Sequence, residues 1–154
     1  ENVIMNKKQK NLTNKGFSLV ELIIVIAIMA VLVGVLAPTL IKNIEKSRES
    51  KDAQNCEQLK SSVEIALQNE TAYSENVVTG GNDIVTIGTN GKATINDKST
   101  AAVGSKAFTN ELNGQIDTTK FELTSKKYKE AAKNGGIKIN VNERGQVTIT
   151  GIPS

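Results

Sequence analysis

Few residues in this chain of 154 could carry out chemistry. It has no histidine or tryptophan and a single cysteine, Cys56. This composition excludes catalytic triads built on histidine, the usual zinc ligand sets and any disulfide within the chain. The sequence has no glycine-rich phosphate loop at a strand end and no calcium-loop pattern, and no pair of acids that converge on one site can be located in it. An enzyme is therefore the least favoured class, and we expect neither a metal nor a cofactor.

Glu21 is the one ionisable residue inside a strongly apolar segment. The segment from Phe17 to Ile41 holds 20 of the 59 apolar residues, and no basic residue lies between Lys15 and Lys42. A carboxylate near a bilayer core costs about 2.5–3.5 kcal/mol, so Glu21 needs a partner or a neutral form. The alternative is that Glu21 lies at the membrane interface, in a first helical turn where the helix dipole favours an acid.

The apolar segment is long enough to span a membrane. Twenty residues from Leu22 to Ile41 extend about 30 Å as a helix, which is the thickness of a bilayer core. A cleaved secretory signal competes with this interpretation, because basic residues precede the segment and Val35-Leu36-Ala37 offers small residues near its end. Pro38 stands where that cut would fall, and the apolar core exceeds the usual length of about 7–15 residues. Both features argue against removal of the whole segment.

The basic excess of the chain lies ahead of this segment. Of the formal charge of +3, all belongs to residues 1–16, since fifteen basic and fifteen acidic side chains balance from Phe17 onward. Cations stay on the cytoplasmic side of a membrane, which places the first residues inside and the bulk of the chain outside. The second flank, from Lys42 to Lys51, is also basic, so charge alone leaves the orientation open. We expect no nucleic-acid partner.

The residues Lys15-Gly16-Phe17-Ser18-Leu19-Val20-Glu21-Leu22, followed at once by the apolar run, resemble the class III leader and N-terminus of type IV pilins. In that family a prepilin peptidase cuts after the glycine on the cytoplasmic face and methylates the new N-terminal residue. The resemblance covers roughly Lys7 to Leu40. It implies a cut between Gly16 and Phe17, N-methylation of Phe17, and pairing of the new ammonium with Glu21 of an adjacent subunit.

Gly34 and Pro38 form a second pattern within the apolar segment. Proline removes the helical hydrogen bond to the carbonyl four residues earlier, which here belongs to Gly34, itself a poor helix former. We predict a kink or a locally unwound stretch between them. The alternative is that both residue types are simply commoner in transmembrane helices. The resemblance adds that pilins often lose helix here on packing.

After Ile41 the sequence becomes charged but keeps a helical period. An apolar stripe recurs at intervals of three and four residues: Ala53, Cys56, Leu59, Val63, Ala66 and Leu67. We predict one long helix from about Ser18 to Gln68, polar nearly all round between Lys42 and Asp52, with a sheet covering the stripe. We expect Cys56 to be a buried thiol acting as a small hydrophobe, with interchain oxidation as the alternative.

The remainder is typical of strands and turns. Two hairpins are predicted, one over residues 84–95 with Asn90-Gly91 at its turn and one over residues 137–149 with its turn at residues 142–145. Between them, Asn113-Gly114 predicts a turn and residues 125–132 a short helix. The lysines of that helix are interleaved with acids, which favours a solvated face over a DNA-binding one.

These elements predict an α+β protein, in which one long N-terminal helix, transmembrane in its first half and amphipathic in its second, packs on a small, mostly antiparallel sheet. The predicted parts are a cleaved leader (1–16), a transmembrane and assembly segment (17–41), an amphipathic segment (42–68) and a β-rich head (69–154). Residues 1–4 are expected to precede the true start at Met5. The lack of a disulfide and the Lys/Asn/Ile-rich composition indicate a Gram-positive anaerobe such as a clostridium.

The resemblance implies a structural subunit of a type IV pilus that serves adhesion, twitching motility or biofilm formation. Its partners would be other copies of itself, prepilin peptidase, the assembly platform with its ATPase, and membrane lipid before assembly. It would be stored as a single-pass precursor in the cytoplasmic membrane, with the leader inside, and then reach the cell surface. Two alternatives stay open: a pseudopilin of a secretion or DNA-uptake system or a minor pilin, and a single-span membrane protein with a ligand-binding ectodomain.

Overall fold

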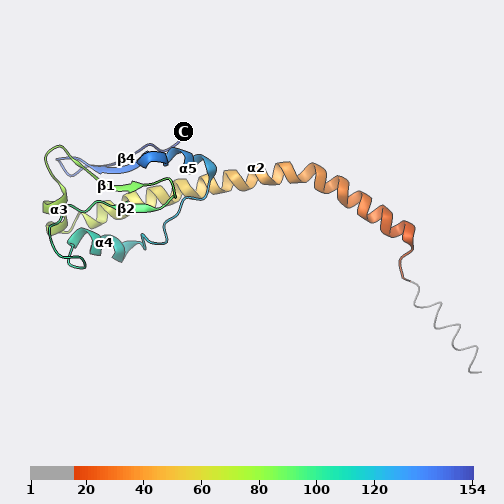
Figure 1. The fold of residues 1–154 in the computed structure, drawn as a ribbon, viewed down its shortest axis with the longest axis horizontal. Helices are drawn as coiled ribbons and strands as arrows, with labels where there is room; N and C mark the ends of the chain where they lie inside the picture. The colour runs from red at the N-terminus through yellow and green to blue at the C-terminus, as the bar shows by residue number, and fades with distance from the viewer. Residues whose placement is uncertain (1–15) are drawn as a thin grey trace, which may run out of the picture. The chain divides into compact units, whose positions relative to one another are not determined.

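The structure is a computed structural model that describes residues 16–154 (Figure 1). Most of the leader, including its four lysines, lies outside the described residues. The chain divides into two compact units, residues 1–42 and 43–154, and each is described by itself. The elements in chain order are α2 (Leu19–Ala66), α3 (Glu70–Asn76), β1 (Asn82–Ile87), β2 (Ala93–Ile95), α4 (Ala107–Gln115), α5 (Lys126–Ala131), the 3₁₀ turn η1 (Lys133–Gly135), β3 (Ile137–Val141) and β4 (Val147–Thr150).

The described part of the first unit is the apolar part of helix α2 and the three residues before it. Every large apolar side chain from Phe17 to Ile41 is at least 50% exposed. The most apolar 18-residue window of the helix has a mean hydropathy of 3.1, and none of it is buried. The helix is thus long and apolar enough to cross a membrane.

Gly34 and Pro38 both lie inside helix α2. The helix is continuous from Leu19 to Ala66 and includes both residues. The single chain therefore has no locally unwound stretch between them. A loss of helix at this point stays a prediction for the assembled state.

The second unit, residues 43–154, is a head built on a four-stranded sheet in the order β2-β1-β3-β4. All neighbouring strands are antiparallel, so both predicted hairpins and the α+β class are confirmed. Gly91 and Gly145 in the two hairpin turns have φ values of 75° and 82°. Glycine adopts this left-handed conformation freely, which explains why these turns are readable in the sequence.

The predicted stripe of α2 forms one wall of the core. Figure 1 shows the strands gathered along the C-terminal part of this helix. Cys56, Leu59 and Val63 are fully buried, as expected, and join one cluster with sheet residues Ile84, Val85, Ile87, Ile137, Ile139 and Val141. Strand β3 alternates buried and half-buried residues, as a sheet with one covered face requires. Ala53, predicted on the stripe, is exposed, and the buried residue there is Asp52.

Two short helices differ from the sequence expectation. Asn113-Gly114, expected to turn, lies inside α4, which buries Phe108 and Leu112 one turn apart. Burial of two large side chains outweighs the cost of about 1 kcal/mol for a glycine in a helix.

Helix α3 has no apolar period of its own and was not predicted. Asn69 caps it by accepting a hydrogen bond from the Ala72 N–H at 3.1 Å. The short helix α5 confirms the prediction for residues 125–132.

A polar cluster centred on Asn76 and Asp97 ties the loops of the head together. The buried Asn76 donates from Nδ2 to Asp97 Oδ1 at 3.1 Å and accepts at Oδ1 from the Lys98 N–H at 2.9 Å. Asp97 also accepts from Thr109, at 2.6 Å from its hydroxyl, and from the Ser99 N–H at 3.0 Å. Burial favours the neutral acid, but the combined hydrogen bonds outweigh it and lower the pKa of Asp97. The carboxylate is thus held in its charged form.

Asp52 is a fully buried carboxylate that joins α2 to the start of α5. It accepts from the Ser125 N–H at 2.8 Å, from the Thr124 N–H at 3.0 and 3.1 Å, and from the Thr124 hydroxyl at 3.3 Å. Glu45, two turns earlier, accepts from the Lys126 N–H at 2.7 Å. Acids at a helix N-terminus are favourable, and the hydrogen bonds offset the cost of burying the charge.

We expect Asp52→Ala to lower the free energy of unfolding of the head by about 2–4 kcal/mol, because it leaves buried N–H groups without an acceptor. Tyr73 and Tyr128 are the only tyrosines, both lie in the head, and the chain has no tryptophan. Tyrosine fluorescence of the full chain in detergent, followed against urea, therefore reports on the head. Glu57 is an exposed acid on the same helix, so Glu57→Ala serves as the control. We expect it to change the free energy of unfolding by less than about 0.5 kcal/mol. Equal effects of the two changes would contradict the role given to Asp52.

Cys56 should react with thiol reagents only after unfolding. Burial, with smaller contributions from Asp52 and Glu57, raises the pKa of the Cys56 thiol to about 12, whereas an unfolded cysteine has a pKa of about 8.5. The thiolate is the reactive form, so at pH 8 we expect labelling of the folded chain to be at least about a hundredfold slower than in urea. The raised pKa costs no stability below about pH 8, and stability falls as the pH rises from there toward 12. A labelling rate of Cys56 in the folded chain within tenfold of the rate in urea would be inconsistent with this burial.

Candidate functional site

The peptide bond between Gly16 and Phe17 lies in open backbone. Residues 16–18 precede α2 and belong to neither a helix nor a strand. The Phe17 side chain is 88% exposed, and a Cβ atom placed on Gly16 would meet nothing within 4 Å. Proteolysis concentrates at exposed backbone outside regular structure, so the bond is open to a peptidase.

Ser18 and Glu21 form a reciprocal pair at the start of α2. The Glu21 N–H donates to Ser18 Oγ at 3.2 Å, and the Ser18 N–H donates to Glu21 Oε2 at 3.3 Å. The Ser18 carbonyl accepts from the Leu22 N–H at 3.1 Å, which is the first helical hydrogen bond. This arrangement is a capping box, and it satisfies two backbone N–H groups at the helix start.

Glu21 itself lies in the first turn of α2, as the interface alternative expects. Within residues 16–154 no ion pair includes it. A carboxylate offers about four acceptor positions, so its hydrogen bond to Ser18 leaves room for a further donor. Glu21 can therefore cap its own helix and still receive a cation from outside the chain.

The site residues predicted from the sequence do not all lie close together. Gly16, Phe17 and Glu21 are brought together at the start of α2, whereas Gly34 lies about 20 Å further along the helix at 1.5 Å per residue. Ser18 was missed as a site residue, although a serine followed three residues later by a glutamate, directly before an apolar run, is the sequence signature of a capping box. Among the described residues no cluster of three metal-binding side chains occurs.

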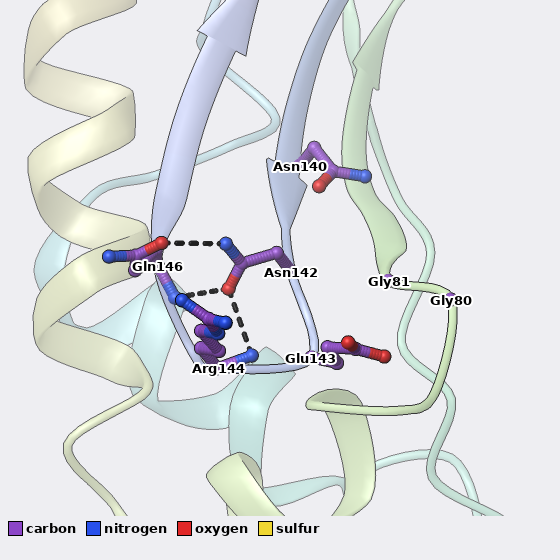
Figure 2. A pocket seen from close by; sticks show the side chains of 7 residues that line it. All are labelled: Gly80, Gly81, Asn140, Asn142, Glu143, Arg144 and Gln146. Carbon is purple, nitrogen blue, oxygen red and sulfur yellow. Dashed lines mark hydrogen bonds between the residues drawn. The ribbon is translucent and has the colours of Figure 1, made fainter.

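The head carries a separate polar hollow of about 410 Å³ beside the β3–β4 turn (Figure 2). Asn142 accepts at Oδ1 from the Arg144 N–H at 3.0 Å and the Gln146 N–H at 2.9 Å, and donates to Gln146 Oε1 at 2.8 Å. Asn140 donates to Asp83 at 2.9 Å. The amide groups thus hold the turn and the sheet in place. The hollow is shaped by the turn, and we assign it no function.

Comparison with known proteins agrees with the geometry at the start of α2. Residues 12–37 match the family model described as the prokaryotic N-terminal methylation motif. The chain is also similar to "Prepilin peptidase-dependent protein A" of Clostridium perfringens (strain 13 / Type A), with 38% identity over 76 residues, 48% of this chain and 54% of the relative. The matched region thus spans about half the length of this curated relative. No solved structure matches the chain.

These matches confirm the resemblance carried by Gly16, Phe17 and Glu21. The chain has a class III prepilin leader, and its N-terminus is pilin-like. The matched motif includes the Gly16–Phe17 bond, the capping box and most of the exposed apolar helix. The motif and the open geometry thus fall on the same residues.

Proposed function

We propose that this chain is the precursor of a type IV pilus subunit, cleaved after Gly16 and N-methylated at Phe17 by a prepilin peptidase. The mature subunit would then polymerise through its N-terminal helix into a surface filament for adhesion, twitching motility or biofilm formation. The observation that carries this proposal is the coincidence of the methylation motif with an exposed, non-helical Gly16–Phe17 bond directly before an uncovered apolar helix.

The exposed apolar part of α2 supports a proposal in which lipid surrounds this helix first and other subunits surround it later. Apolar surface left in water costs about 25 cal/mol per Å², so side chains exposed by half or more from Phe17 to Ile41 require a cover. Lipid of the cytoplasmic membrane covers them in the precursor, with the leader on the cytoplasmic side. Neighbouring copies of the same helix cover them in the filament, after transfer by the assembly platform and its ATPase.

Glu21 sets the register of assembly in this proposal. Cleavage creates an ammonium at Phe17, and the spare acceptor positions of Glu21 allow it to pair with the ammonium of an adjacent subunit. Two charges that are costly alone in an apolar setting are far less so when paired. Gly34 and Pro38 mark where the helix opens on packing, because Pro38 already lacks one helical hydrogen bond.

Two other functions make different predictions. A pseudopilin or a minor pilin would share the leader and the helix but would be scarce in purified fibres. A single-span membrane protein with a ligand-binding ectodomain would keep its leader. The methylation motif favours the pilin-like functions over the latter, because a ligand-binding ectodomain needs no such motif.

Mass spectrometry of fibres sheared from cells should find a chain that begins at Phe17 and carries one added methyl group at its N-terminus. This chain should dominate the preparation if it is the main subunit. An intact leader, or a surface free of fibres that contain the chain, would refute the proposal.

Glu21→Gln should separate assembly from processing. Glutamine keeps a side-chain oxygen that can complete the capping box, but it carries no charge and so cannot form an ion pair with an ammonium. We expect normal cleavage after Gly16 and at least about tenfold fewer fibres in a shearing assay. Glu57→Gln makes the same change on the head part of α2 and should leave the fibre yield unchanged. Wild-type fibre yield from the Glu21→Gln chain would show that the charge does not set the register.

A further inference from the structure

We propose that the head binds the anionic headgroups of the membrane through a basic cluster on α2 and α5. The basic cluster consists of seven side chains from residues 43–52 and 125–133: Lys46, Arg48, Lys51, Lys126, Lys127, Lys129 and Lys133. The proposal rests on the membrane-anchored precursor of the proposed function. It adds a second contact with the bilayer, which the head makes with lipid phosphates.

The fold separates charges that alternate in the sequence. All seven side chains of the basic cluster are exposed. The four acids of the same two segments are buried, hydrogen-bonded, half-buried and paired with a lysine, in this order: Asp52, Glu45, Glu49 and Glu130. The interleaving of lysines with acids, which predicts a solvated face, is therefore weaker on the surface than in the sequence. The exposed cations attract anions, because most of the neighbouring acids are already engaged within the head.

Most of the basic cluster has no acidic partner in the described part of the chain. Lys133 pairs with Glu130 at 2.6 Å, and within residues 16–154 no other member forms an ion pair. The Nζ atom of Lys127 donates to the Ser154 carbonyl at 2.7 Å. On α5 this leaves Lys126 and Lys129 as exposed cations that are open to a partner from outside the chain.

The link between α5 and α2 keeps the basic cluster close to the bilayer surface. Glu45 lies four residues beyond Ile41, the end of the apolar segment, and four residues reach at most about 14 Å. The Lys126 N–H donates to Glu45 at 2.7 Å, so the start of α5 is held at this distance. Headgroups extend about 5–8 Å beyond the hydrocarbon core, and unscreened charge acts over about a further 10 Å at 0.1 M salt. The start of α5 is thus within reach of lipid phosphates.

The rest of the head carries the opposite excess of charge. Residues 43–154 hold fourteen basic and fourteen acidic side chains, and outside the two segments the head has seven basic and ten acidic ones. An anionic bilayer therefore attracts the basic cluster and repels the remainder of the head. The acidic excess of a second copy is the competing partner. The bilayer is favoured because it lies beside the cluster of a single anchored chain before any neighbour arrives.

Acetylation of lysines in the full precursor, reconstituted in lipid nanodiscs, tests this contact. The uncharged reagent N-acetoxysuccinimide is added to nanodiscs of phosphatidylglycerol or of phosphatidylcholine, and peptide mass spectrometry gives the rate at each lysine. We expect Lys46, Lys126 and Lys129 to react at least about threefold more slowly in the anionic lipid at 0.1 M salt. The difference should disappear at about 1 M salt, where the Debye length falls to about 3 Å.

Lys98 is the matched control lysine. It is exposed, lies outside the basic cluster and forms no ion pair within residues 16–154, so it should react equally fast in both lipids. The double variant Lys126→Gln/Lys129→Gln should lower the protection of Lys46 to less than about half, because the cluster then holds fewer charges. Lys98→Gln should leave the protection of Lys46 unchanged.

The outcomes separate this contact from the proposed function. A precursor that fails to insert into either nanodisc refutes membrane storage and hence the proposed function itself. A precursor that inserts but reacts equally fast in both lipids, or is protected equally at Lys98, refutes the lipid contact alone. Protection that persists at 1 M salt would show shielding by burial and overturns the contact. Protection found only in assembled fibres would assign the basic cluster to a second copy, and it also overturns the contact.

Discussion

The head depends on the burial of one stripe of helix α2 against its sheet. Cys56, Leu59 and Val63 are fully buried on the helix, and the inward residues of β1 and β3 face them in one cluster. Neither element can keep its apolar side out of water alone, so helix and sheet require each other. The Asp52 carboxylate extends this contact by holding the start of α5 to the same helix. Short helices and loops then close the remaining sides.

Local features of this fold were readable in the sequence. The hairpins follow from Asn90-Gly91 and from residues 142–145, because tight hairpin turns require a positive φ, which glycine adopts at little cost. The long helix follows from the apolar run up to Ile41 and from the helical spacing of the stripe beyond it, and the burial of that stripe follows from its spacing except at Ala53. At the proposed processing site, Gly16, Phe17 and Glu21 are recognisable because their spacing is fixed within six residues.

The features that were missed depend on contacts between distant residues or on competing local preferences. Asp52 and Ser125 are 73 residues apart, and nothing in either neighbourhood identifies the other as its partner. Asn113-Gly114 has the composition of a turn, but burial of Phe108 and Leu112 keeps it helical. Ser18 differs, because its capping role follows from a short local pattern, a serine three residues before a glutamate.

The polar cluster of the head has a consequence for the surroundings in which the protein can stay folded. Loops that many small secreted domains join by disulfides are joined here by hydrogen bonds between Asn76, Asp97 and Thr109. The chain's one thiol, that of Cys56, is enclosed in the core. Hydrogen bonds do not depend on the redox potential of the surroundings, whereas disulfides are reduced when reductant is plentiful. The head therefore needs no disulfide, and hence no oxidant, to join these loops.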